Sequence, residues 1–263
     1  MSRKALFFDI DGTLLSENTH EVPESAVYAL SETRKNGNLV FINSGRSYKG
    51  LGEMAQIIEN DGCLCGCGTF VIVDGKPIYQ YRIPHERGIA IKKAIIEHGF
   101  DVILESTEGN YIREEESWIP EVNRLRDSMK AAGSVVLKSW NDDSYDYDKF
   151  CVLADENSDR KGLFAFLEPD IEVIDRGGDF YECVPRGHSK ATAIEQVLKH
   201  YGLKKEDVYV FGDSSNDLAM FQYAEHAVLM GKHDAVLEPY ATFVTKTVEE
   251  DGIMYAMKEL GLI

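Results

Sequence analysis

Three short polar segments of the sequence combine residue types that can do chemistry together. They occupy residues 9–13 (DIDGT), 43–46 (NSGR) and 212–217 (GDSSND). Asp9, Asp11 and Asp213 offer hard carboxylate oxygens, which are the ligands that Mg²⁺ prefers in proteins. Carboxylates that pack together repel one another and need a cation between them. The segments therefore predict a magnesium site.

The first segment has two other interpretations, a calcium loop and an ordinary solvated turn. A calcium loop of the EF-hand type needs glycine at its sixth position and glutamate at its twelfth. Counted from Asp9, these positions hold Leu14 and His20, so the calcium loop is excluded. An ordinary solvated turn is the second interpretation, because Asp-Gly is a common turn signal. A turn would explain one segment, but it would not explain three.

Each polar segment follows a run of apolar residues that is typical of a buried strand. These runs cover residues 4–10, 38–43 and 207–211. In open α/β sheets, ligands bind beyond the carboxyl ends of the strands. We therefore expect the three segments to meet at one edge of a sheet.

The remaining pattern predicts an α/β fold with a Rossmann-like three-layer core, built on a parallel sheet, and an inserted α+β cap domain. We place the core at residues 1–82 and 186–263 and the cap at residues 83–185. Core helices are expected at residues 23–35, 47–59, 189–201, 217–225 and 251–260. Cap helices are expected at residues 86–98 and 120–132, and cap strands at residues 101–104, 134–140, 150–154, 171–174 and 179–184.

Charge and hydropathy narrow the possible partners. The net charge of −17 would repel nucleic acid, and no basic patch with interleaved aromatic residues offsets it. No apolar stretch approaches the roughly 20 residues of a membrane helix. The apolar run near the N-terminus is broken by Asp9 and Asp11, so no export signal is predicted and we expect a cytoplasmic location. An anionic substrate would need local positive charge, and Lys190 at the start of a predicted helix could supply it.

Three of the five cysteines alternate along one expected strand, at Cys63, Cys65 and Cys67. A metal or redox site is one interpretation. Zinc ligands usually come from separate turns and include a fourth partner, which this spacing does not offer. We favour the alternative that these thiols act as small buried hydrophobes.

At these residues the sequence resembles the haloacid dehalogenase superfamily, and specifically its Cof-type sugar-phosphatase branch. Four motifs carry the resemblance, in the order and spacing of the family. They are residues 9–14 (DIDGTL), 44–46 (SGR), 187–190 (GHSK) and 212–217 (GDSSND). Residues 61–62 and 66–69 also look like a segment of this branch, although Cys67 stands where asparagine is more usual.

The resemblance implies a Mg²⁺-dependent phosphatase with two catalytic aspartates. Asp9 would attack phosphorus and form an aspartyl-phosphate. Asp11 would protonate the leaving oxygen and then deprotonate the attacking water. Asp9, the backbone carbonyl of Asp11, and Asp213 would be the protein's metal ligands, and Asp217 would support them from behind.

The resemblance also implies a phosphate site that includes Ser44, Gly45 and Lys190, with Asn216 nearby. Arg46 would contact the substrate or the cap. The cap would close over the site and read the rest of the substrate. Its candidate contacts are Arg176, Glu182 and Arg186, for which surface ion pairs are an equally good explanation.

The expected activity is hydrolysis of a small phosphorylated metabolite, such as a sugar phosphate. A phosphomutase is the nearest enzyme alternative, because it would pass the aspartyl-phosphate to a second sugar hydroxyl. A non-catalytic protein that binds phosphorylated metabolites is disfavoured, since Asp9, Asp11, Lys190 and Asp213 are all present. The sequence predicts neither the physiological substrate nor the oligomeric state.

Overall fold

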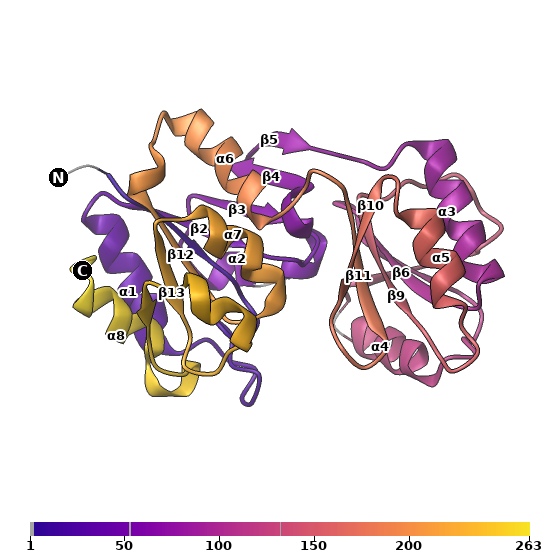
Figure 1. The fold of residues 1–263 in the computed structure, drawn as a ribbon. Helices are drawn as coiled ribbons and strands as arrows, with labels where there is room; N and C mark the ends of the chain where they lie inside the picture. The colour runs from indigo at the N-terminus through magenta and orange to yellow at the C-terminus, as the bar shows by residue number, and fades with distance from the viewer. Residues whose placement is uncertain (1–2, 53, 132) are drawn as a thin grey trace. The chain divides into compact units, whose positions relative to one another are not determined.

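The computed structural model describes residues 3–52, 54–131 and 133–263, which form two compact units (Figure 1). The first unit comprises Met1–Gly45, Glu53–Tyr79 and Ser189–Ile263. The second comprises Arg46–Gly52 and Gln80–His188. The sequence predicts the core at residues 1–82 and 186–263. The units divide between Tyr79 and Gln80 and between His188 and Ser189, and Arg46–Gly52 groups with the second unit.

The first unit is built on an eight-stranded sheet. In spatial order its strands are β14 (Phe243–Val244), β13 (His226–Leu229), β12 (Val208–Gly212), β1 (Ala5–Phe8), β2 (Leu39–Asn43), β3 (Gly62–Cys65), β4 (Phe70–Val73) and β5 (Lys76–Gln80). Neighbouring strands run parallel from β14 to β3, and β4 then pairs antiparallel with β3. This confirms the predicted α/β class and its parallel-sheet core.

The central strands are apolar on both faces because helices cover the sheet. All four residues of β1 are buried. Ala5 and Phe7 belong to the same apolar cluster as residues of α6 (Lys190–Tyr201) and α7 (Leu218–Tyr223). Helices α1 (Glu24–Lys35) and α8 (Gly252–Glu259) pack against each other.

The second unit holds a six-stranded, mostly antiparallel sheet. Its spatial order is β10 (Ile171–Asp175), β11 (Phe180–Pro185), β9 (Lys149–Leu153), β6 (Asp101–Glu105), β7 (Asn110–Arg113) and β8 (Val135–Lys138). Only the pair β7–β8 is parallel among the pairs of this sheet that the structure describes. The helices of this unit are α3 (His85–Glu97), α4 (Pro120–Ala131) and α5 (Arg160–Leu167). Alternation along β6 sends Val102 to the cluster under α3 and α5, and Ile103 to the cluster under α4.

The predicted helix over residues 47–59 is wrong. The structure has a 3₁₀ turn at Lys49–Leu51 and a short α2 at Met54–Ile57; the predicted helix also included residue 53, which lies outside the described residues. Between them Gly52 adopts a φ of +55°, a left-handed conformation that a continuous helix cannot contain.

Strand β7 and helix α5 were missing from the sequence prediction. The start of helix α5 had a signal in the sequence, because aspartate is a preferred N-cap residue. The Asp159 side chain caps the helix by accepting a hydrogen bond from the Gly162 backbone N–H. Leu163 and Leu167, four residues apart, are its buried positions.

Within the described residues, no helix combines the length and the apolar character needed to cross a membrane.

Candidate active site

The ends of three neighbouring strands build the site. In the sheet, Phe8 of β1 is in register with Phe211 of β12 on one side and with Ile42 of β2 on the other. Asp9 directly follows β1, and its backbone N–H donates to the Phe211 carbonyl at 3.0 Å. Because parallel strands end at the same edge of a sheet, the three polar segments lie side by side.

Two glycines allow carboxylates to approach the backbone closely. A Cβ atom on Gly12 would lie 2.4 Å from Oδ2 of Asp213, and the φ of Gly12 is +82°. A Cβ atom on Gly212 would lie 2.6 Å from Oδ2 of Asp217. Asp213 is also held from the side, because Oγ1 of Thr13 donates to its Oδ1 at 2.8 Å. Both carboxylates therefore lie directly against the backbone of a glycine, and Asp213 is also held by Thr13.

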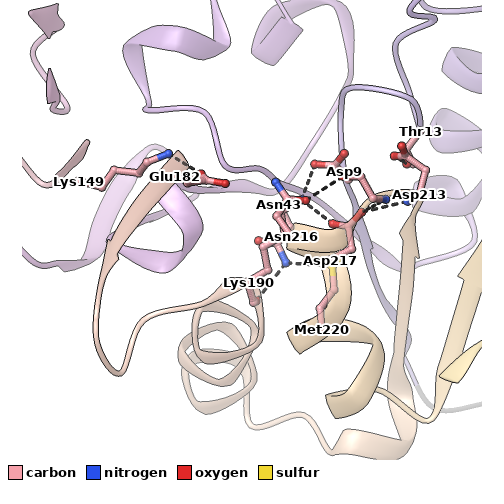
Figure 2. A network of polar contacts seen from close by, with 11 residues as sticks. Asp9, Thr13, Asn43, Lys149, Glu182, Lys190, Asp213, Asn216, Asp217 and Met220 are labelled. Carbon is pink, nitrogen blue, oxygen red and sulfur yellow. Dashed lines mark hydrogen bonds and ion pairs between the residues drawn. The ribbon is translucent and has the colours of Figure 1, made fainter. Parts of the chain in front are cut away.

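Three carboxylates, those of Asp9, Asp213 and Asp217, form one buried cluster (Figure 2). Asp9, Asp213 and Asp217 each offer an oxygen within 4.8 Å of the others. It is the single group of metal-ligating side chains found among the residues that the structure describes.

Lys190 contacts two of these three carboxylates and is completely buried. Its Nζ donates to Oδ1 of Asp9 at 2.5 Å, to Oδ1 of Asp217 at 2.5 Å and to Oδ1 of Asn216 at 3.3 Å. Lys190 is the first residue of α6, and Ser189 caps this helix by accepting a hydrogen bond from the Thr192 backbone N–H. The capped helix start thus directs the ammonium group towards the strand ends.

Burial and mutual repulsion disfavour the charged forms of the aspartates. Burial is the largest cause that raises the pKa of Asp9 to about 7, and the charge of Lys190 opposes it. Burial, followed by the charges of Asp9 and Asp217, raises the pKa of Asp213 to about 8. Burial alone would lower the pKa of Lys190, but the charges of Asp217 and Asp9 raise it above its usual value.

The cluster suits a divalent cation. Three carboxylates face one ammonium group, so full ionisation would leave two negative charges in a buried space. Within the described chain, Oδ2 of Asp9 and Oδ2 of Asp213 accept no hydrogen bond, whereas both oxygens of Asp217 are engaged. Oδ2 of Asp217 accepts from the backbone N–H groups of Asp213 and Ser214 at 2.9 and 3.1 Å. The unengaged oxygens of Asp9 and Asp213 are hard donors, which is the donor type that Mg²⁺ takes.

The other predicted site residues are distributed as follows. Ser44 is buried, and its backbone N–H donates to the Leu64 carbonyl at 2.8 Å. Gly45 belongs to the first unit, as Ser44 does. Asp11 is in that unit too, and its side chain is exposed. Arg46 groups with the second unit, where its Nη1 donates to the Gly50 carbonyl at 3.4 Å.

Of the cap residues considered for substrate contact, Glu182 has a structural partner. It is 5% exposed, and its Oε1 lies 2.5 Å from Nζ of Lys149. Nζ of Lys149 also lies 2.7 Å from Oε2 of Glu105. These three side chains tie the adjacent strands β6, β9 and β11 together through a buried ion-pair network.

The cysteines show no metal-site geometry in the described part of the chain. None of the five cysteines forms a disulfide in the described chain, and all five are buried. Burial raises the pKa of Cys63 to about 12 and raises that of Cys65 well above its usual value, which keeps both thiols protonated. Their environment agrees with the interpretation that they are small hydrophobes. Cys67 adopts a φ of +52° between two glycines, and its charge interaction with Lys190 contributes to the raised pKa of that lysine.

Two polar residues at the site were not assigned a role from the sequence. Thr13 lies inside the first motif, so its place beside Asp213 could have been inferred from that segment. Asn43 ends an otherwise apolar strand, LVFIN, and opens the second polar segment, and both facts could have pointed to a role for it.

Comparisons with known proteins agree with this geometry. The sequence model of the haloacid dehalogenase-like hydrolase family matches residues 6–257. The chain belongs to this family. It is 31% identical over 276 residues to the predicted phosphatase YkrA of Bacillus subtilis strain 168, with 100% of both chains covered.

Two further relatives extend the comparison. A predicted bifunctional phosphatase and peptidyl-prolyl cis-trans isomerase of Streptococcus pyogenes serotype M6 is 32% identical over 277 residues, covering 99% of this chain. The chain spans only 54% of the length of that relative. Among solved structures, the subclass IIB sugar phosphatase BT4131 superposes with a TM-score of 0.84 and 28% identity, covering 99% of this chain and 100% of that one. The chain is therefore a phosphatase of the Cof-type branch of the haloacid dehalogenase family.

Proposed function

We propose that this phosphatase hydrolyses small phosphomonoesters with Mg²⁺, through an aspartyl-phosphate on Asp9. The observation that carries the proposal is the buried carboxylate of Asp9, which Lys190 orients through one oxygen and which leaves its other oxygen unengaged. Phosphoryl transfer depends mainly on positioning and on neutralising charge, and a preorganised carboxylate beside a fixed ammonium group supplies both.

In the first step, Asp9 would attack phosphorus while the P–O bond to the leaving group breaks. Asp9 must be ionised to attack, and Lys190 favours the ionised form against the effect of burial. Asp11, two residues further along the same loop, would donate a proton to the leaving oxygen. In the second step, Asp11 would take a proton from water, whose oxygen attacks the phosphorus and releases Asp9.

Mg²⁺ would be held by the carboxylates of Asp9 and Asp213 together with the backbone carbonyl of Asp11. Asp217 would keep its place behind them, because its two oxygens already accept hydrogen bonds from Lys190 and from backbone N–H groups. When bound, the cation supplies charge neutralisation for the phosphoryl oxygens.

Ser44, the backbone N–H of Gly45, Lys190 and Asn216 would hold the phosphoryl group. Arg46 would contact the rest of the substrate, and residues 83–185 would act as the cap that selects it. We place sugar phosphates first among the substrates, because the similar subclass IIB protein BT4131 is named a sugar phosphatase.

A panel of phosphorylated metabolites tests this function. Purified protein with Mg²⁺ should release inorganic phosphate from at least one sugar phosphate, and a chelator should abolish the release. Asp9→Asn is the matched control, because it keeps the shape of the side chain but is a far weaker nucleophile. An isomeric sugar phosphate formed without release of phosphate would indicate a phosphomutase instead. No turnover of any kind across the panel would contradict the proposed function.

A further inference from the structure

Asn43 is a polar residue at a position that the fold makes part of the core. It is the last residue of β2, directly before Ser44, and it is fully buried. Side chains alternate along a strand, so Asn43 points to the same face as Phe41, which packs in the cluster that α6 and α7 cover. An apolar residue would be the ordinary occupant of such a position.

The Asn43 amide makes a specific contact with the start of α6 (Figure 2). Its Nδ2 donates to the backbone carbonyl of Lys190 at 3.1 Å, and Sδ of Met220 lies 3.6 Å from the same nitrogen. The carbonyl of Lys190 can only accept, so the amide nitrogen must face it and the orientation of the amide is determined. Asn43 therefore fastens the end of β2 to the first residue of α6.

The other end of the amide lies in an unfavourable environment. Oδ1 of Asn43 is buried and has no hydrogen-bond partner in the described chain. A buried acceptor without a partner costs folding free energy, and an apolar side chain of similar size would avoid that cost. Positions that break the rules of core packing are often functional.

We propose that Asn43 is a positioning residue for Lys190. Its hydrogen bond would fix the backbone of Lys190 against the strand end that also carries Ser44. The long lysine side chain then starts from a defined point and reaches Asp9 and Asp217 together. Because displacements near 1 Å can lower turnover by about a hundredfold, a loosened helix start would impair catalysis. This inference rests on the proposed phosphatase function.

Asn43→Leu separates positioning from a merely structural role. Leucine has the same branching as asparagine and is larger, but it lacks the unpaired carbonyl. The cost of the added volume and the relief of the buried acceptor should roughly offset each other, so the variant should fold and melt near the wild-type temperature. Its kcat should fall about tenfold or more, whereas KM should change by less than about threefold, since Lys190 orients Asp9 for the attack. Circular dichroism and steady-state phosphate release measure the two effects.

Thr33→Val provides a matched control in the same unit. Thr33 is also fully buried, and its Oγ1 donates to the Leu262 carbonyl at 2.9 Å, a contact made by residues outside the catalytic cluster. This variant should keep the wild-type kcat whatever its stability.

The following results would overturn the role of Asn43 or the proposed function on which it rests. A folded Asn43→Leu protein with wild-type kcat would overturn the proposal. If that variant does not fold, the smaller Asn43→Ala is judged by the same criteria, and failure of both to fold would mean that Asn43 is structural. Wild-type protein without phosphatase activity would instead refute the proposed function, and this inference with it.

Discussion

The unbalanced charge of the aspartate cluster predicts that Asp213→Asn stabilises the metal-free protein at neutral pH. The pKa of Asp213 is raised from 3.8 to about 8 in the folded protein, chiefly by burial. Between these values the folded protein holds a proton that the unfolded chain has lost. The free energy of unfolding must then fall as the pH rises through this range. Asparagine has no proton to lose and can still accept the hydrogen bond from Thr13.

The size of the effect follows from proton linkage. One proton difference changes the free energy of unfolding by about 1.36 kcal/mol for each pH unit. Between about pH 5 and about pH 7, the wild-type protein should therefore lose about 2.7 kcal/mol relative to Asp213→Asn. For a chain of this size the difference corresponds to a shift of about 5–10 °C in Tm.

Thermal unfolding in a chelator, followed by circular dichroism at several pH values, measures this difference. Comparing the two proteins cancels the titrating groups that do not interact with Asp213, such as Asp148 and His188. Asp127→Asn is the control, because Asp127 lies on the surface of α4 with a side chain that is 73% exposed. It should follow the wild-type pH profile.

Mg²⁺ should offset the stability advantage of Asp213→Asn at neutral pH. Cation at about one hundred times its Kd stabilises a protein by about 2.7 kcal/mol, and this gain should grow with pH because metal ligands must be deprotonated. The wild-type protein should show the gain, and Asp213→Asn should largely lose it. Parallel pH profiles of the two proteins in the chelator would refute the argument that burial and repulsion act on this carboxylate.

Three further substitutions test separate parts of the account. Gly12→Ala should lower both Tm and activity, because the new Cβ would lie 2.4 Å from a carboxylate oxygen of Asp213 at a φ of +82°; an unchanged Tm and kcat would contradict this. Thr13→Val removes the hydroxyl that donates a hydrogen bond to Asp213 at 2.8 Å, so the Mg²⁺ concentration for half-maximal activity should rise about 10–100-fold. An unaltered Mg²⁺ affinity in calorimetry would contradict this. Lys149→Met should destabilise the protein by about 3–5 kcal/mol in urea unfolding, because it leaves the buried Glu182 and the half-buried Glu105 without their cation. A stability loss below about 1 kcal/mol would mean that the network contributes little.

Much of the aspartate cluster could be predicted from the sequence because it depends on strand ends. Asp9 and Asp213 each follow an apolar run directly, and parallel strands bring such positions to one edge. Lys190 could be found through the family resemblance and through its place in the first turn of a helix. These inferences need only the local pattern and the order of the elements.

Other features depend on contacts that the local pattern does not encode. Asp217 accepts hydrogen bonds from two backbone N–H groups four and three residues before it, so its role depends on the tight turn after β12. The contact between Asn43 and Lys190 joins residues 147 positions apart. The helix predicted over residues 47–59 was wrong because its apolar spacing was given more weight than Gly52, whose φ of +55° breaks it.

The attack by Asp9 is the central claim, and trapping the phosphoenzyme tests it most directly. Asp11→Asn, which should form the aspartyl-phosphate but hydrolyse it slowly, would be mixed with Mg²⁺ and a turned-over sugar phosphate and then quenched in acid. Peptide mass spectrometry should find one phosphoryl group, on Asp9, and Asp9→Asn should carry none. A phosphoryl group on another residue, or steady turnover by Asp9→Asn, would contradict the account.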